Sequence, residues 1–203
     1  MKKKQTSFTL PVMICTAMLS ALAFVLMLLE LPYILFPTAP YLKLDFSDIP
    51  AIFGAVVFGP VCGILVELIK NILEMLVRGI GTQMGFGNIQ NFLVGCAYVI
   101  PFALLYRRME KRGIGLSARL IASGIVGLVV MIIIGFLSNL VMAPLFFRFF
   151  LGDPMTWEAA VAASIISIPF NAIKAILLTV LMIPVITLGI KPIKKMVHSA
   201  GTL

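Results

Sequence analysis

The stretch DIPAIFGAVVFGPVCGILVELIKNILEMLVRG, residues 48–79, decides how this chain folds. As one continuous helix it would be about 48 Å long at 1.5 Å per residue, well beyond the roughly 30 Å of a bilayer's hydrocarbon core. Phe58-Gly59-Pro60 interrupts it. Because glycine adopts unusual backbone angles and proline lacks an amide proton, a helix is expected to end there. The stretch is therefore predicted to form two short helices, near 48–58 and 61–78, joined by a tight turn.

The rest of the chain is strongly apolar. Of its 203 residues, 61% are hydrophobic and 12% are charged, and the mean hydropathy is +1.13. Uncharged runs cover 5–29, 79–106 and 120–147, each longer than the roughly 20 residues that cross a bilayer as a helix. This composition excludes a soluble enzyme or a disordered tail, and it predicts an all-α, multi-pass membrane protein.

The positive charges indicate the topology. The formal net charge is +8, and eleven of the sixteen Lys and Arg residues lie in the two tails and around the loop at 107–119. Such residues concentrate on the cytoplasmic side of membrane proteins, so both termini are predicted to be cytoplasmic, which requires an even number of crossings. The predicted bundle has six transmembrane helices and forms one membrane-embedded domain over residues 1–203. The helices are expected near 8–31, 48–58, 61–78, 88–107, 117–143 and 158–189.

Groups that could carry catalysis are missing from the sequence. There is no phosphate-binding G-x-x-x-x-G-K-[ST] motif, no nucleophile beside a general base and no pair of histidines at ligand spacing. The three cysteines lie in apolar segments without C-x-x-C spacing, which indicates neither disulfides nor zinc. The basic residues do not form a groove for nucleic acid. We therefore predict a protein that is not an enzyme and has no catalytic residue, metal site or cofactor.

A charged stripe runs along the predicted helix at 61–78. Its members recur at spacings of three and four and so share one face. They are Glu67, Lys70, Asn71, Glu74 and Arg78. Charges at membrane depth face a bundle interior or each other, which leaves two interpretations: an ion or proton relay, or an internally neutralised stripe. The alternation of opposite charges favours the second.

A second polar face lies on the predicted helix at 158–189, where Ser164, Ser167, Asn171 and Lys174 are aligned. Lys174 stands near the middle of the otherwise uncharged segment 159–190, where its side chain reaches an interface least easily. A ligand or an internal partner is therefore expected beside its ammonium. The Asn171 amide offers a donor and an acceptor, the pattern that recognises an imide or amide edge.

Further amides lie near the expected outer ends of helices. Asn88, Gln90 and Asn91 open the helix at 88–107, and Asn139 lies in the helix at 117–143. Capping and bonds between helices are their commoner roles. Together with the second polar face, however, they place polar groups in the outer half of the bundle. That arrangement suits a small, largely apolar solute with a few hydrogen-bonding groups.

Four blocks of sequence resemble a known family. They are YLKLDFSDIPAIFGAVVFGPVCG (41–63), NFLVG (91–95), SNLVMAPL (138–145) and IPFNAIKA (168–175). In this order they resemble the substrate-binding S components of energy-coupling factor (ECF) vitamin transporters, and PFNAIK with the upstream SN is similar to the riboflavin-specific members. The resemblance implies a six-helix bundle in the bacterial cell membrane, a single substrate-binding domain that captures riboflavin from outside. It also implies partners: a transmembrane coupling subunit and two ABC ATPase subunits.

The resemblance further implies which residues bind. Riboflavin is the transported ligand rather than a cofactor, and the coupling subunit is expected to meet Ala17 and Ala21, since small residues four apart allow close helix approach. Lys43 stands where a small polar residue is expected: pointing inward it would favour a phosphorylated flavin such as FMN, and pointing outward it is an exposed charge. The implied ligand-binding residues are Leu42, Lys43, Asn91, Gly95, Asn139, Asn171 and Lys174.

The leading hypothesis is thus a membrane subunit that captures riboflavin, with FMN also considered, for ATP-driven uptake. A self-sufficient carrier is the first alternative, driven by an ion or proton gradient through Glu67, Lys70 and Glu74. The second alternative is an assembly protein without a solute, with Ala17 and Ala21 as its contact face.

Overall fold

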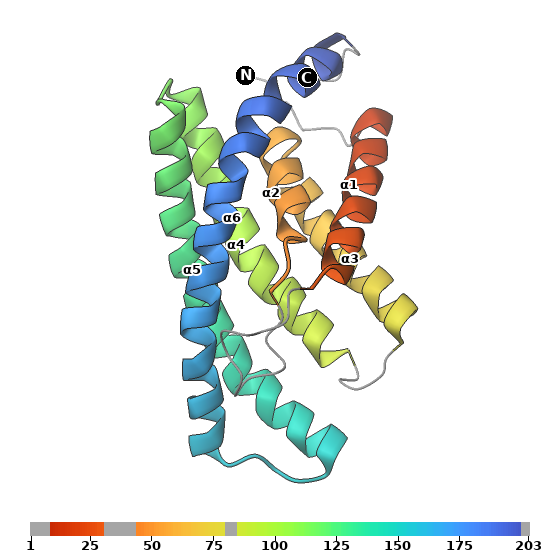
Figure 1. Ribbon diagram of the computed structural model, residues 1–203, viewed down its shortest axis with the longest axis vertical. Helices are drawn as coiled ribbons and strands as arrows, with labels where there is room; N and C mark the ends of the chain where they lie inside the picture. The colour runs from red at the N-terminus through yellow and green to blue at the C-terminus, as the bar shows by residue number, and fades with distance from the viewer. Residues whose placement is uncertain (1–8, 31–43, 80–84, 200–203) are drawn as a thin grey trace, which may run out of the picture.

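The computed structural model describes residues 9–30, 44–79 and 85–199, which are helical apart from short connections (Figure 1). Extended strands are missing from these ranges, so the all-α prediction is confirmed. The helices are α1 (Leu10–Leu28), α2 (Asp48–Val57), α3 (Pro60–Arg78), α4 (Phe86–Lys111), α5 (Leu116–Phe146), the π-helix η1 (Phe147–Leu151) and α6 (Trp157–Ser199).

Four of the described helices are long and apolar enough to cross a membrane. Their spans are Leu10–Leu28, Phe86–Lys111, Leu116–Phe149 and Trp157–Gly189. Of the other two, α2 has only 10 residues, and α3 carries the charged stripe. Three helices run past their predicted ends, α4 to Lys111, α5 to Phe146 and α6 to Ser199. The extensions of α4 and α6 are basic, and positive charge is favourable at a helix C-terminus.

The turn between α2 and α3 lies where the sequence predicts it. Gly59 has φ +120°, a conformation that favours glycine, and Pro60 is the first residue of α3. The Arg107 guanidinium of α4 donates to the carbonyl oxygens of Ala55, Val56 and Val57 at 3.2–3.4 Å. These carbonyls belong to the last turn of α2, where the Ala55 carbonyl also accepts from the Gly59 backbone N–H at 3.1 Å. Arg107 of α4 thus helps to cap the C-terminal end of α2.

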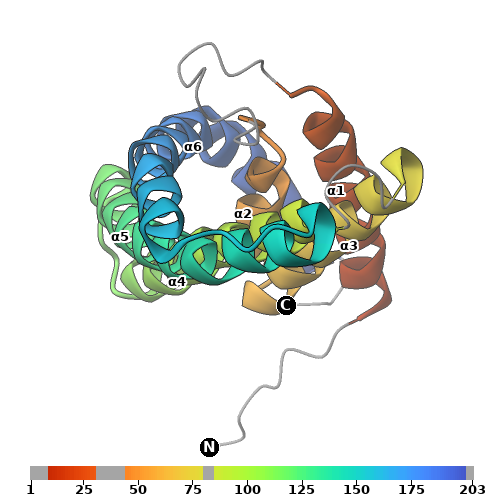
Figure 2. The same ribbon diagram turned by 90° about the horizontal axis from the view of Figure 1, so that it is seen from below.

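The helices form two groups that meet through α2 and through direct packing of α3 against α4 (Figure 2). One group contains α1 and α3, and the other contains α4, α5 and α6; α2 contacts α1, α3, α4 and α6. Every residue of α2 except Ile49 is buried. Figure 1 shows that one end of the bundle holds the start of α1, the α2–α3 turn, the α4–α5 connection and the end of α6. The other end holds the start of α4 and η1.

Close packing around α2 depends on Gly63 of α3. A Cβ atom there would lie 2.6 Å from Ala55 Cβ, 2.8 Å from Val99 Cγ1 and 2.9 Å from the Ala51 carbonyl oxygen. The missing side chain thus lets α2, α3 and α4 meet at one point. Ala51, Ala55 and Val99 are themselves fully buried.

Replacing Gly63 by Ala is expected to lower the free energy of unfolding by about 1–3 kcal/mol, because the added methyl group has no space between three helices. Thermal or denaturant unfolding of the purified protein in detergent measures this. Gly115→Ala is the matched control, since nothing lies within 4 Å of a Cβ there and its φ is −58°. Equal stability of the two variants would contradict the close-packing argument.

Candidate functional site

A cavity of about 290 Å³ lies between α4, α5 and α6. Its walls come from the first half of α4, the last turns of α5 and the first half of α6, so it is at the end of the bundle opposite the α4–α5 connection. Most of the lining is apolar: Phe86, Val94, Met142, Ala143, Phe146, Phe147, Met155, Ala163 and Phe170. Six polar side chains complete it: Gln90, Asn91, Asn139, Ser167, Asn171 and Lys174.

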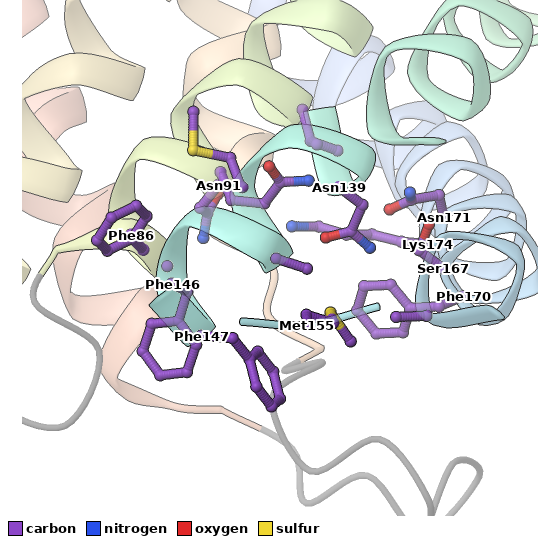
Figure 3. A pocket seen from close by; sticks show the side chains of 16 residues that line it. Phe86, Asn91, Asn139, Phe146, Phe147, Met155, Ser167, Phe170, Asn171 and Lys174 are labelled. Atoms are coloured by element: carbon purple, nitrogen blue, oxygen red, sulfur yellow. The ribbon is translucent and has the colours of Figure 1, made fainter. Parts of the chain in front are cut away.

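Helical spacing accounts for the polar side of the cavity. Ser167, Asn171 and Lys174 are four and three residues apart, so one face of α6 presents all three. Figure 3 shows Asn91 and Asn139 reaching the same cavity from α4 and α5. Buried Asn91 Oδ1 and Gln90 Oε1 accept no hydrogen bond from any described residue. Unsatisfied buried acceptors are costly, so a ligand with N–H or O–H donors fits this wall.

Of the seven predicted ligand residues, the structure brings four to the cavity: Asn91, Asn139, Asn171 and Lys174. Gly95 is on α4 but does not line it; a Cβ atom at Gly95 would overlap Glu67 Oε2. Its lack of a side chain makes room for a charged residue of α3. Leu42 and Lys43 lie outside the described residues.

Aromatic residues at the cavity were not identified as site residues from the sequence. Phe86 and Phe146 meet edge to face with centroids 6.0 Å apart, and Phe146 meets Phe147 in the same way at 5.9 Å. In a membrane protein, phenylalanines are expected to face lipid or to pack between helices. No spacing in the sequence distinguishes the phenylalanines that line a cavity from these. The one available signal is Pro144, which lies inside α5 just before the π-helical turn that follows.

Lys174 also has internal partners. Its Nζ lies 3.0 Å from Asp48 Oδ2 and 3.5 Å from Asp45 Oδ2. Lys70 Nζ is paired with Asp48 Oδ1, lies 2.8 Å from Glu67 Oε2 and donates to Ser47 Oγ at 2.7 Å. All six residues are buried. We call Asp45, Ser47, Asp48, Glu67, Lys70 and Lys174 the buried charge cluster.

The charged stripe on α3 is neutralised by pairing. Besides the Glu67–Lys70 pair, Glu74 Oε1 lies 3.5 Å from Arg78 Nη1, and Arg78 also pairs with Glu30 of the segment after α1. Asn88 Nδ2 donates to Glu74 Oε2 at 2.6 Å. These contacts agree with the second interpretation of the stripe, in which its charges compensate each other.

Lys70→Met is expected to lower the free energy of unfolding by about 3–5 kcal/mol, because it removes the cation that pairs with buried Glu67 and leaves Asp48 with Lys174 alone. Glu110→Gln is the control: Glu110 Oε1 pairs with Arg119 Nη1 at 3.1 Å in a partly exposed position, where loss of charge costs less than about 1 kcal/mol. Denaturant unfolding in detergent compares the two. A Lys70→Met loss as small as that of Glu110→Gln would contradict the role of the cluster in stability.

An apolar cavity with a few polar groups, enclosed by helices of membrane-spanning length, defines a membrane protein that binds a small molecule. Comparison with known proteins makes this more specific. Residues 12–186 match the family model described as "ECF transporter, substrate-specific component". The chain therefore belongs to the family of substrate-specific components of ECF transporters, which are transporter components and not enzymes.

Named relatives and a solved structure agree. The chain is 35% identical to the riboflavin transporter FmnP of Bacillus subtilis (strain 168), covering 89% of this chain and 92% of the relative. It is also 35% identical to the riboflavin transporter RibU of Staphylococcus aureus (strain TCH60), covering 84% and 86%. A solved structure of the S component of a bacterial ECF transporter matches with a TM-score of 0.61 and 34% identity, over 85% of this chain and 91% of that one.

Proposed function

We propose that this chain is the membrane subunit that captures riboflavin from outside the cell for ATP-driven uptake by an ECF-type ABC transporter. The observation that carries the proposal is the convergence of three Asn amides and the Lys174 ammonium on one apolar cavity. Relatives at 35% identity are named riboflavin transporters. The pyrimidine edge of a flavin has an N–H between two carbonyls, which amides and an ammonium can satisfy.

The two ends of the ligand have different requirements. The dimethylbenzene end of the flavin needs apolar walls, which Phe86, Phe146, Phe147 and Met155 supply. The unsatisfied acceptors of Asn91 and Gln90 suit donors on the ring or the ribityl chain. Leu42 and Lys43 complete the proposed ligand set from the first outer loop, and Gly95 contributes by letting α3 approach α4. An inward Lys43 would extend binding to FMN.

Asn171→Ala is expected to weaken riboflavin binding by about 1–3 kcal/mol, because a polar group of the flavin loses its partner. Lys174→Ala is expected to act in the same direction. Quenching of riboflavin fluorescence by the detergent-purified protein measures both. Thr187→Ala is the control, since the exposed Thr187 hydroxyl bonds only within α6, to the Ile183 and Pro184 carbonyls. A wild-type protein that leaves riboflavin fluorescence unchanged would refute the proposed function.

The proposed topology has six crossings, both termini in the cytoplasm and a multi-pass position in the bacterial cell membrane. Its support is the arrangement of the helix ends: α1 begins and α6 finishes at the same end as the basic α4–α5 connection. Positive residues favour the cytoplasmic side. With this orientation the cavity opens toward the exterior, as capture from outside requires, and α2 and α3 are the two short crossings.

The proposed partners are a transmembrane coupling subunit and two ABC ATPase subunits. Ala17 and Ala21 are exposed on α1, whereas the opposite stripe of the helix packs inward. A second helix can approach closely where side chains are small. We place the contact with the coupling subunit on this face.

Ala17→Leu combined with Ala21→Leu is expected to lower uptake about tenfold, equivalent to roughly 1.4 kcal/mol of assembly free energy, while riboflavin binding stays unchanged. Uptake by membrane vesicles containing the whole transporter is compared with fluorescence quenching. Ala162→Leu, at an exposed position of α6, is the matched control. Uptake by this chain alone, abolished by dissipating an ion gradient and not by removing ATP, would instead select a self-sufficient carrier.

A further inference from the structure

One carboxylate joins the cavity to the helices behind it. Asp48 is fully buried at the first residue of α2. Its Oδ1 pairs with Lys70 of α3, and its Oδ2 lies 3.0 Å from the Nζ of Lys174 on α6. Asp48 is therefore the one member of the buried charge cluster for which ion pairs with both lysines are seen in the described structure.

The two lysines differ in what they can offer a ligand. An ammonium has three donors. Those of Lys70 are matched by Ser47 Oγ, an Asp48 oxygen and Glu67 Oε1, and Lys70 does not line the cavity. Lys174 lines the cavity. Its Nζ donates to Asp45 Oδ2 at 3.5 Å and forms an ion pair with Asp48 Oδ2 at 3.0 Å. At least one donor of Lys174 is thus available to a bound molecule.

Both carboxylates are themselves held in place. Lys70 fixes Asp48 from the far side, and the first turn of a helix, where Asp48 lies, favours negative charge. Asp45 Oδ1 accepts a hydrogen bond from the Ser47 backbone N–H at 2.8 Å. A free lysine side chain has many rotamers, and ordering it on binding costs affinity. Carboxylates anchored in this way order the ammonium before the ligand arrives.

We propose that Asp48 is a positioning residue for ligand binding: it holds the Lys174 ammonium so that its remaining N–H points into the cavity. The inference rests on the proposed function, since it concerns the same cavity. It predicts that a substitution of Asp48 weakens binding through Lys174 and not through the fold in general.

The test is a double-mutant cycle on the full chain in detergent, read by quenching of riboflavin fluorescence. Asp48→Asn keeps the shape and removes the charge, so affinity is expected to fall about tenfold. In a Lys174→Met background the same substitution is expected to cause no further loss, since no ammonium remains to be positioned. An equal loss in both backgrounds would overturn the proposal, because a purely structural effect is independent of Lys174.

A second measurement needs no flavin. Labelling of Lys174 by a small amine-reactive reagent, read by mass spectrometry, is expected to rise several-fold in Asp48→Asn because the ammonium is released. Glu67→Gln is the matched control: Glu67 is an equally buried carboxylate that pairs with Lys70, and Lys174 labelling should stay at the wild-type rate. Equal labelling in wild type and Asp48→Asn would overturn the proposal. A wild type that ignores riboflavin would refute only the proposed function.

Asp45→Asn serves if Asp48→Asn does not fold. Its Oδ1 can still accept from Ser47 N–H, while the charge beside Lys174 is lost. Because the Asp45–Lys174 distance is longer, a loss of about threefold is expected, again absent in the Lys174→Met background. A loss that persists there would count against positioning by carboxylates.

Discussion

The carboxylate of Asp48, shared by two buried lysines, is the interaction on which this bundle depends. A buried charge is tolerated only when it is fully partnered, and removal of one partner is far more damaging than its net contribution suggests. Here the partners come from α2, α3, α6 and the segment before α2. The requirement to satisfy them therefore draws the two helix groups together around the start of α2. The hydrophobic core, which includes Ile52, Val66 and Phe102, fills space between the helices.

That arrangement separates two tasks. The cavity belongs to α4, α5 and α6, whereas the exposed small-residue face belongs to α1 in the other group. The short α2 lies between them, with the buried charge cluster at its first residue and the Arg107 guanidinium at its last turn. The proposed ligand contact to Lys174 and the proposed partner contact on α1 can thus be altered separately, because no residue takes part in both.

Much of the fold could be read from local patterns. The Gly59-Pro60 break and the single face of α6 depend on residues close in sequence, and the structure has both. The contacts that could not be predicted join residues that are far apart in the sequence. Lys174 and Asp45 are 129 residues apart, so spacing could raise the question of an internal partner but not identify it. Gly95 looks the same in sequence whether it admits a ligand or Glu67, and the cavity phenylalanines look like any membrane-facing ones.

The charged stripe of α3 has a consequence for biosynthesis. Each ionised group near a bilayer's midplane opposes insertion by roughly 2.5–3.5 kcal/mol, and the 19-residue helix α3 carries four charged side chains. Asp48 is translated just before α3, but Lys174 is among the last membrane residues to leave the ribosome. Until it arrives, Asp48 has Lys70 alone. The full set of ion pairs around Asp48 can therefore form only after the final helix has been delivered.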